Sequence, residues 1–112
     1  MIVAKSLTVA QGDLIIRRVK KLPPEAKPEE RKGRLVLAHS ETGHHHAIDE
    51  DGCVRYSYKD PLVCYLRIDA EHADLVHHRP FDTHETIRLL KGTYEVRRQR
   101  EWTPEGWRRV ED

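Results

Sequence analysis

Turn signals punctuate this chain roughly every eight to twelve residues, and the apolar runs between them are short and rich in β-branched residues. Each signal contains a glycine or a proline; the signals lie at residues 11–13, 40–43, 49–52, 59–61, 79–80, 91–92 and 103–106, and a proline-rich stretch at 22–33 separates the first two. Short strands joined by such turns are typical of a small β-barrel or a sandwich. The sequence therefore predicts an all-β fold built of antiparallel hairpins.

The apolar runs define the expected strands. They lie at residues 2–4, 14–19, 34–39, 44–48, 53–58, 62–68, 75–78, 86–90 and 93–102. The polar stretch 69–74 has room for one helical turn. Residues 22–33 hold three prolines among charged side chains, a composition that cannot bury enough surface to order itself. We expect an exposed loop there.

Length and charge limit the organisation of the chain. Its 112 residues are close to the commonest size of one domain, so we expect a single domain over residues 1–112. Charged residues make up 35% of the sequence, yet the net charge is only +1, so no global field attracts nucleic acid or membranes. Residues 1–10 lack the apolar core of a signal peptide, and no stretch is long enough to span a membrane. We expect a cytoplasmic protein without a membrane partner.

The two cysteines, Cys53 and Cys64, lie on opposite arms of a hairpin that turns at residues 59–61. If Tyr58 faces Leu62, Cys64 lies opposite Tyr56 and Cys53 opposite Arg67, so the thiols do not meet. The spacing of a zinc knuckle is absent as well. We expect two free thiols that serve as small core or strand residues.

A run of histidines gives the strongest chemical signal. Four of the eight histidines fall within residues 39–46, around a turn between two apolar stretches. In a hairpin with a four-residue loop, His39 lies opposite His44, and alternation places both on one face with His46 while His45 points away. Three imidazoles at one end of an apolar face suit Zn, Fe or Ni. The alternative is a solvated loop that binds metal only adventitiously.

Histidines elsewhere could complete such a site. His84 precedes an expected strand, so a closing sheet can bring it to the cluster as a fourth ligand. His77 and His78 point to opposite faces of an extended segment, so at most one of them joins. Glu50 is a further candidate, either as a ligand or as a general base. His72, between Glu71 and Ala73, is most simply a solvated side chain.

His44-x-His46, followed after three residues by Glu50, resembles the core of the first cupin motif. In cupins two histidines and a glutamate on adjoining strands bind a metal, and a histidine of a second motif completes the set. The resemblance implies a small β-barrel and assigns His84 to the second motif. The order of features along most of the chain is also similar to that of small uncharacterised bacterial and phage-associated proteins, which brings no activity with it.

A predicted metal site can be either catalytic or structural. A site of three histidines and a water would allow a metal-dependent enzyme, in which Zn²⁺ or Fe²⁺ lowers the pKa of the bound water. Glu41, Glu50 or Glu85 would then be the candidate general base. A site closed by four histidines would instead be structural, fastening sheets together. Sequence does not decide between the two.

A second class of function is nucleic-acid or assembly binding through the C-terminal ribbon. A turn at 103–106 brings Trp107 opposite Trp102, and arginines beside aromatics suit backbone contact and base stacking. The candidates are Arg97, Arg98, Arg100, Trp102, Trp107 and Arg108. Carboxylates lie among them, so cross-strand ion pairing on a solvated face explains the same pattern. Exposed edge strands would also allow a self-associating homo-oligomer or a phage structural component.

Overall fold

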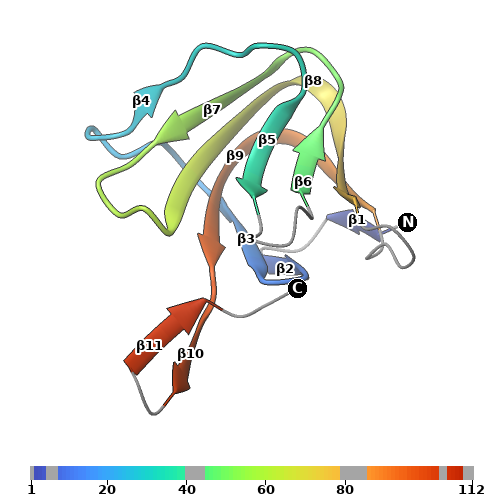
Figure 1. Cartoon of the computed structure of the whole chain (residues 1–112). Coiled ribbons are helices and arrows are strands. Elements are labelled where there is room, and N and C mark those ends of the chain that lie inside the picture. Colours follow the sequence, from blue (N-terminus) through green and yellow to red (C-terminus); the bar gives the residue numbers. More distant parts are fainter. Residues whose placement is uncertain (1, 5–7, 40–44, 79–85, 104–105, 110–112) are drawn as a thin grey trace.

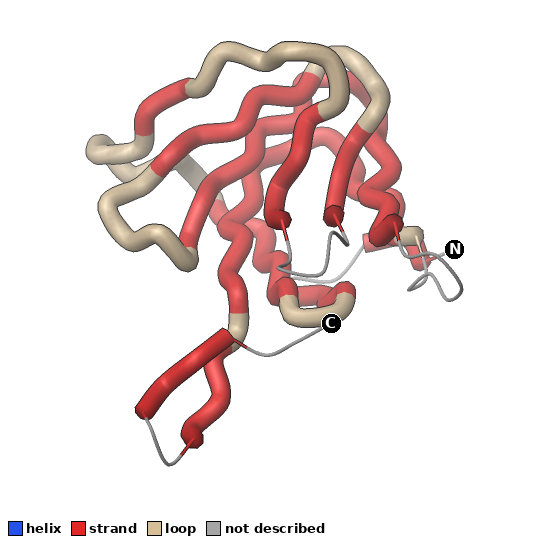
Figure 2. The backbone as a smooth tube through the Cα atoms, in the orientation of Figure 1, coloured by secondary structure: helices blue, strands red, loops and turns tan. Residues whose placement is uncertain are grey.

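The computed structural model describes residues 2–4, 8–39, 45–78, 86–103 and 106–109 (Figure 1); at Ala4, His39, His78 and from Arg100 onward it describes the backbone alone. All regular structure in these ranges is β-strand, as the tube view shows (Figure 2). The prediction of an all-β fold is confirmed. No helix with the length and apolar character needed to cross a membrane occurs in the described ranges.

Nine of the described strands form one sheet and the last two form a separate hairpin. The strands are β1 (Ile2–Ala4), β2 (Thr8–Gln11), β3 (Leu14–Val19), β4 (Lys27–Pro28), β5 (Leu35–His39), β6 (His45–Ile48), β7 (Cys53–Ser57), β8 (Val63–His78), β9 (Ile87–Arg98), β10 (Arg100–Thr103) and β11 (Gly106–Arg109). The main path runs β2-β3-β9-β8-β6-β5, with β1 on β9, β7 on β8 and β4 on β7. Pairing is antiparallel except between β1 and β9. The path ends in β2 and β5, so the sheet is curled and open rather than a closed barrel (Figure 1).

The sixteen-residue strand β8 organises the sheet. Its first half pairs with β7 and its second half with β6, while β9 follows both halves. The register between β8 and β9 shifts between Ile68 and His72, where the amides of Asp69 and Ala70 both donate to Gly52 O. The expected helical turn at 69–74 is therefore wrong. His72 and Asp74 flank Ala73, which is fully buried, so these two polar residues lie on the outer face of the strand.

The core lies on one face of the curled sheet, because alternate positions of every long strand are apolar. Its fully buried members include Leu14, Ile48, Leu66, Leu75 and Leu89. A smaller cluster covers the opposite face, with Tyr56, Val63 and Tyr65 at its centre. The two sides together bury most of the large apolar side chains that the structure describes.

Part of the loop at 22–33 covers this second cluster. Leu22 and Ala26 pack against it, and Lys27 and Pro28 pair with β7. Arg31 donates hydrogen bonds to the carbonyls of Ile48, Asp49 and Glu50, in the turn between β6 and β7. Most of the loop is exposed, and these contacts attach parts of it to the sheet. Sequence patterns did not predict that the Arg31 guanidinium binds several backbone carbonyls at once.

Both cysteines are free and buried, as expected. The hairpin register is one residue away from the expected one: Tyr56 lies opposite Tyr65, and Cys53 opposite Ile68. The reason lies in the turn, where the Asp60 side chain accepts from Leu62 N at 2.9 Å and Asp60 O accepts from Val63 N at 3.0 Å. These two bonds give the connection one more residue than a three-residue turn.

Gly92 should be the least replaceable of the described glycines. Its φ of 152° lies in a region that is nearly confined to glycine, and a Cβ there would meet the Arg18 guanidinium at 2.7 Å. We expect Gly92→Ala to lower the free energy of unfolding by about 2–3 kcal/mol in urea titrations. Gly33→Ala is the matched control, with φ 70° and no atom within 4 Å of the added Cβ, and should cost about 1 kcal/mol. Equal losses for the two variants would contradict this account.

Candidate metal centre

The histidines gather in two adjacent cross-strand rows at one end of the sheet, where β5, β6 and β8 run side by side (Figure 1). In one row His39 pairs with His45, and His45 pairs with His78. In the next row His46 stands between Ala38 and His77. The row of three and the row of two together hold five of the eight histidines of the chain.

The register of this hairpin differs from the expected one. We expected His39 opposite His44, but His39 lies opposite His45. The register shifts between Val36 and Ala38, and Leu37 and Ala38 are consecutive buried residues at that shift. An extra residue on one strand moves every later partner by one position, so it also changes which residues share a face. His45 and His46 do point to opposite faces, as their pairing rows require.

The row of two is buried in the core. His46 and His77 are both 0% exposed, and their rings stack with centroids 3.9 Å apart and an interplanar angle of 12°. A coordinated ion lies close to the plane of its imidazole, at about 2.0–2.1 Å from nitrogen. An ion shared between these rings would lie far from both ring planes. In this arrangement His46 and His77 do not ligate a common ion.

Both nitrogens of His46 have contacts in the protein. Its Nδ1 lies 2.9 Å from Gln11 Oε1, and Gln11 Nε2 donates to Leu75 O at 2.9 Å. The donation to Leu75 orients the amide, so Oε1 faces the ring and Nδ1 is the donor. On the other side, His46 Nε2 lies 3.3 Å from Asp13 Oδ1. His46 is therefore a buried anchor for the β2–β3 turn.

The β2–β3 turn is shaped to reach this anchor. Gly12, with φ 56°, opens the two-residue hairpin turn Gly12-Asp13, which is flanked by the paired residues Gln11 and Leu14. The other Asp13 carboxylate oxygen lies 3.4 Å from two nitrogens of Arg98, and Asp13 O accepts from Gln99 N at 2.9 Å. Sequence reasoning took Gln11 and Asp13 only as turn residues. Their partners are distant in the chain, so no local pattern could reveal the network.

The row of three lies on the face opposite to the core. His45 is half-buried, and His39 and His78 are placed by their backbone register. The predicted ligands His44 and His84 lie outside the described residues, so their role stays a prediction. Glu50 lies in the β6–β7 turn, where its Oε2 accepts from Asp74 N at 2.7 Å. It is tied to the middle of β8 rather than to the histidine rows.

The arginines at the end of β9 are ion-paired. Arg97 Nε donates to Glu95 Oε1 at 2.7 Å, and Arg98 contacts Asp13. Glu95 lies on the same strand as Arg97 and Asp13 is buried, so neither pair is the cross-strand pairing on a solvated face that the sequence suggested. Trp102 does lie opposite Trp107 in the β10–β11 hairpin, as predicted. The side chains of Arg100, Trp102, Trp107 and Arg108 are outside the described part, and nucleic-acid binding through them stays a prediction.

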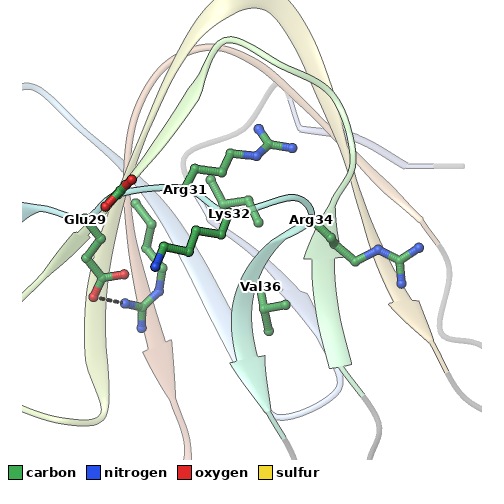
Figure 3. Close-up of a pocket in the computed structure, with 8 residues that line it drawn as sticks. Glu29, Arg31, Lys32, Arg34 and Val36 are labelled. Atoms are coloured by element: carbon green, nitrogen blue, oxygen red, sulfur yellow. Dashed lines mark hydrogen bonds and ion pairs between the residues drawn. The ribbon is translucent and has the colours of Figure 1, made fainter.

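A basic pocket of about 80 Å³ lies beside the start of β5. Figure 3 shows that the charged ends of Arg31, Lys32 and Arg34 spread in different directions instead of converging. Arg31 binds backbone carbonyls, Arg34 pairs with Asp49 at 2.7 Å, and Arg55 pairs with Glu29 at 2.6 Å. The three guanidinium groups are therefore engaged by acceptors within the fold, and the side chains do not converge on a common anion site.

Residues 10–99 match a family described as a domain of unknown function, DUF8820. The match covers most of the chain and contains the β2–β3 turn, both histidine rows and the whole of β8 and β9. The chain belongs to this family. No curated protein and no solved structure matches it.

Replacing Gln11 tests the anchor. Gln11→Leu keeps the volume of the side chain but leaves His46 Nδ1 and Leu75 O without the amide. We expect a loss of about 3 kcal/mol in the free energy of unfolding, since a buried polar group without a partner costs about 1–3 kcal/mol. Glu71→Ala, on the exposed side of β8, should stay within about 0.5 kcal/mol of the parent protein. A small effect of Gln11→Leu would show that the turn is held by other contacts.

The Glu95 cluster predicts acid sensitivity. Burial raises the pKa of Glu95, but the guanidiniums of Arg97 and Arg17 lower it by more, so the pKa lies below its ordinary value. A lowered folded-state pKa contributes stability above the unfolded pKa, and this stability is lost as pH falls through the folded value. We expect Glu95→Gln to flatten the dependence of unfolding free energy on pH between about 5 and 2. If the unfolding free energy of Glu95→Gln depends on pH as steeply as that of the parent protein, Glu95 is not a source of the acid sensitivity.

Proposed function

We propose that this member of the DUF8820 family is a divalent-metal-binding β-domain that holds its ion through His39, His45 and His78. The observation that carries the proposal is the register, which aligns these three histidines in one row across β5, β6 and β8. His39 and His78 belong to the set that the sequence predicted as ligands. His45 enters because the register shift at Leu37 moves it opposite His39.

The spacing of a sheet suits such a site. Neighbouring strands lie about 4.8 Å apart, and directly paired residues have Cβ atoms about 4.5–5.5 Å apart. Two nitrogens on a tetrahedral zinc ion lie roughly 3.4 Å apart, so side chains that lean toward the middle strand can reach one ion. Imidazole ligands favour Zn, Fe or Ni over Ca or Mg, and three of them leave one coordination position for water or another ligand.

The buried row supports the proposed ligands from the other side of the sheet. His46 and His77 follow and precede His45 and His78 directly in the chain, and their rings are packed in the core. Rigid backbone under a ligand set lowers the cost of ordering it when the ion binds. Chain connectivity also attaches His44 directly to β6, and places His84 in the β8–β9 connection, so either can supply a further ligand.

Metal titration tests the proposal. Protein made without a histidine tag should bind Zn²⁺ or Ni²⁺ by calorimetry, and His45→Ala and His78→Ala should each weaken binding at least about tenfold. Glu71→Ala, at an exposed position on β8, is the control. Unchanged zinc affinity in His45→Ala would refute a site formed by His39, His45 and His78. Loss of affinity only in His44→Ala and His84→Ala would instead support the ligands expected from the sequence.

A further inference from the structure

A second group of ligand-type side chains lies farther along β8. Glu50 comes from the β6–β7 turn, and His72 and Asp74 lie two positions apart on β8, so they share its outer face. One ligand atom from each residue lies within 4.8 Å of those of the other two. All three side chains are partly buried. Among the residues that the structure describes, this is the group with metal-site geometry.

The group is held in place by contacts from two sides. Glu50 Oε2 accepts the backbone amide of Asp74 at 2.7 Å, which ties the β6–β7 turn to the strand. Arg31 donates to the carbonyls of that same turn, including the carbonyl of Glu50. Arg88, opposite Asp74 on β9, donates to both of its carboxylate oxygens, at 2.9 and 3.2 Å. The carboxylates are therefore fixed before any ligand arrives.

Charge in the group favours a cation. The hydrogen bond from Arg88 lowers the pKa of Asp74 below its ordinary value, so Asp74 is a carboxylate at neutral pH. Two carboxylates and one guanidinium leave a net charge of −1 beside the His72 imidazole. A divalent ion would turn this into +1 and leave room for one anionic ligand. Arg88 would compete with the ion for the Asp74 oxygens.

We infer that Glu50, His72 and Asp74 form a second divalent-cation site, separate from the histidine row. Two carboxylates with one imidazole suit Mn²⁺, Fe²⁺ or Zn²⁺ better than Ca²⁺ or Mg²⁺, which prefer oxygen ligands alone. Asp74 and His78 are four residues apart on one strand, which separates the two sites by roughly 13 Å. A single ion cannot be shared between them. The inference stands whether or not the histidine row binds metal.

Mn²⁺ titration followed by electron paramagnetic resonance tests the site. Wild-type protein should bind Mn²⁺, and His72→Ala and Glu50→Gln should each weaken binding at least about tenfold, while Zn²⁺ binding at the histidine row stays unchanged. His45→Ala should show the reverse pattern, so failure of one site is distinguishable from failure of the other. His72→Ala removes no contact described for the core, and circular dichroism would verify its fold.

Arg88→Gln gives a sharper result. It removes the competing guanidinium, so Mn²⁺ should bind more tightly than to the wild-type protein. Weaker Mn²⁺ binding in Arg88→Gln would contradict the claim that Arg88 competes with the ion for the Asp74 oxygens. Mn²⁺ affinity equal to wild type in both His72→Ala and Glu50→Gln would overturn the site itself.

Discussion

One long strand, and the pairing it makes on both sides, places the core and the candidate sites of this domain. β8 pairs with β9 along its length, with β7 over one half and with β6 over the other. Backbone hydrogen bonds between strands fix register, and register decides which side chains share a face. The core, both rows of histidines and the Glu50, His72 and Asp74 group all take their positions from this strand. The sheet curls around the core without closing into a barrel (Figure 1).

The contacts of His46 connect two parts of the sheet that no strand pairing connects directly. The sheet path ends in β2 and β5, so no ladder joins its two edges. Gln11 and Asp13 bring the β2–β3 turn to His46 on β6, and Arg98 links the same carboxylate to β9. Polar contacts in a buried position are directional, and losing one partner exposes the other to a desolvation cost. The network therefore holds two distant parts of the curl in one defined position.

Local patterns predicted the all-β class, most strands and the pairing of Trp102 with Trp107, because alternation and turn residues are local signals. They did not predict the register of either central hairpin. The shift at Leu37 has no residue signature, and the turn at Asp60 depends on a side-chain acceptor. The local patterns also predicted two strands, 62–68 and 75–78, where the structure has the single strand β8. The stretch 69–74 between them is mostly polar, so in the sequence it resembles a loop. For the site, the gathering of histidines could be anticipated, but the contacts of Gln11, Asp13 and Asp74 could not, since their partners lie far away in sequence.

The placement of His45 and His46 in adjacent rows has an evolutionary consequence. Consecutive histidines on one strand belong to opposite faces, so parity along the strand decides which imidazole is solvent-facing and which is interior. Deleting Ala47 within β6 would exchange their faces relative to Ile48 without changing the number of histidines. A comparison of relatives should therefore count residues between the register shift and the histidines, because histidine content alone would not reveal whether the outward-facing trio is retained.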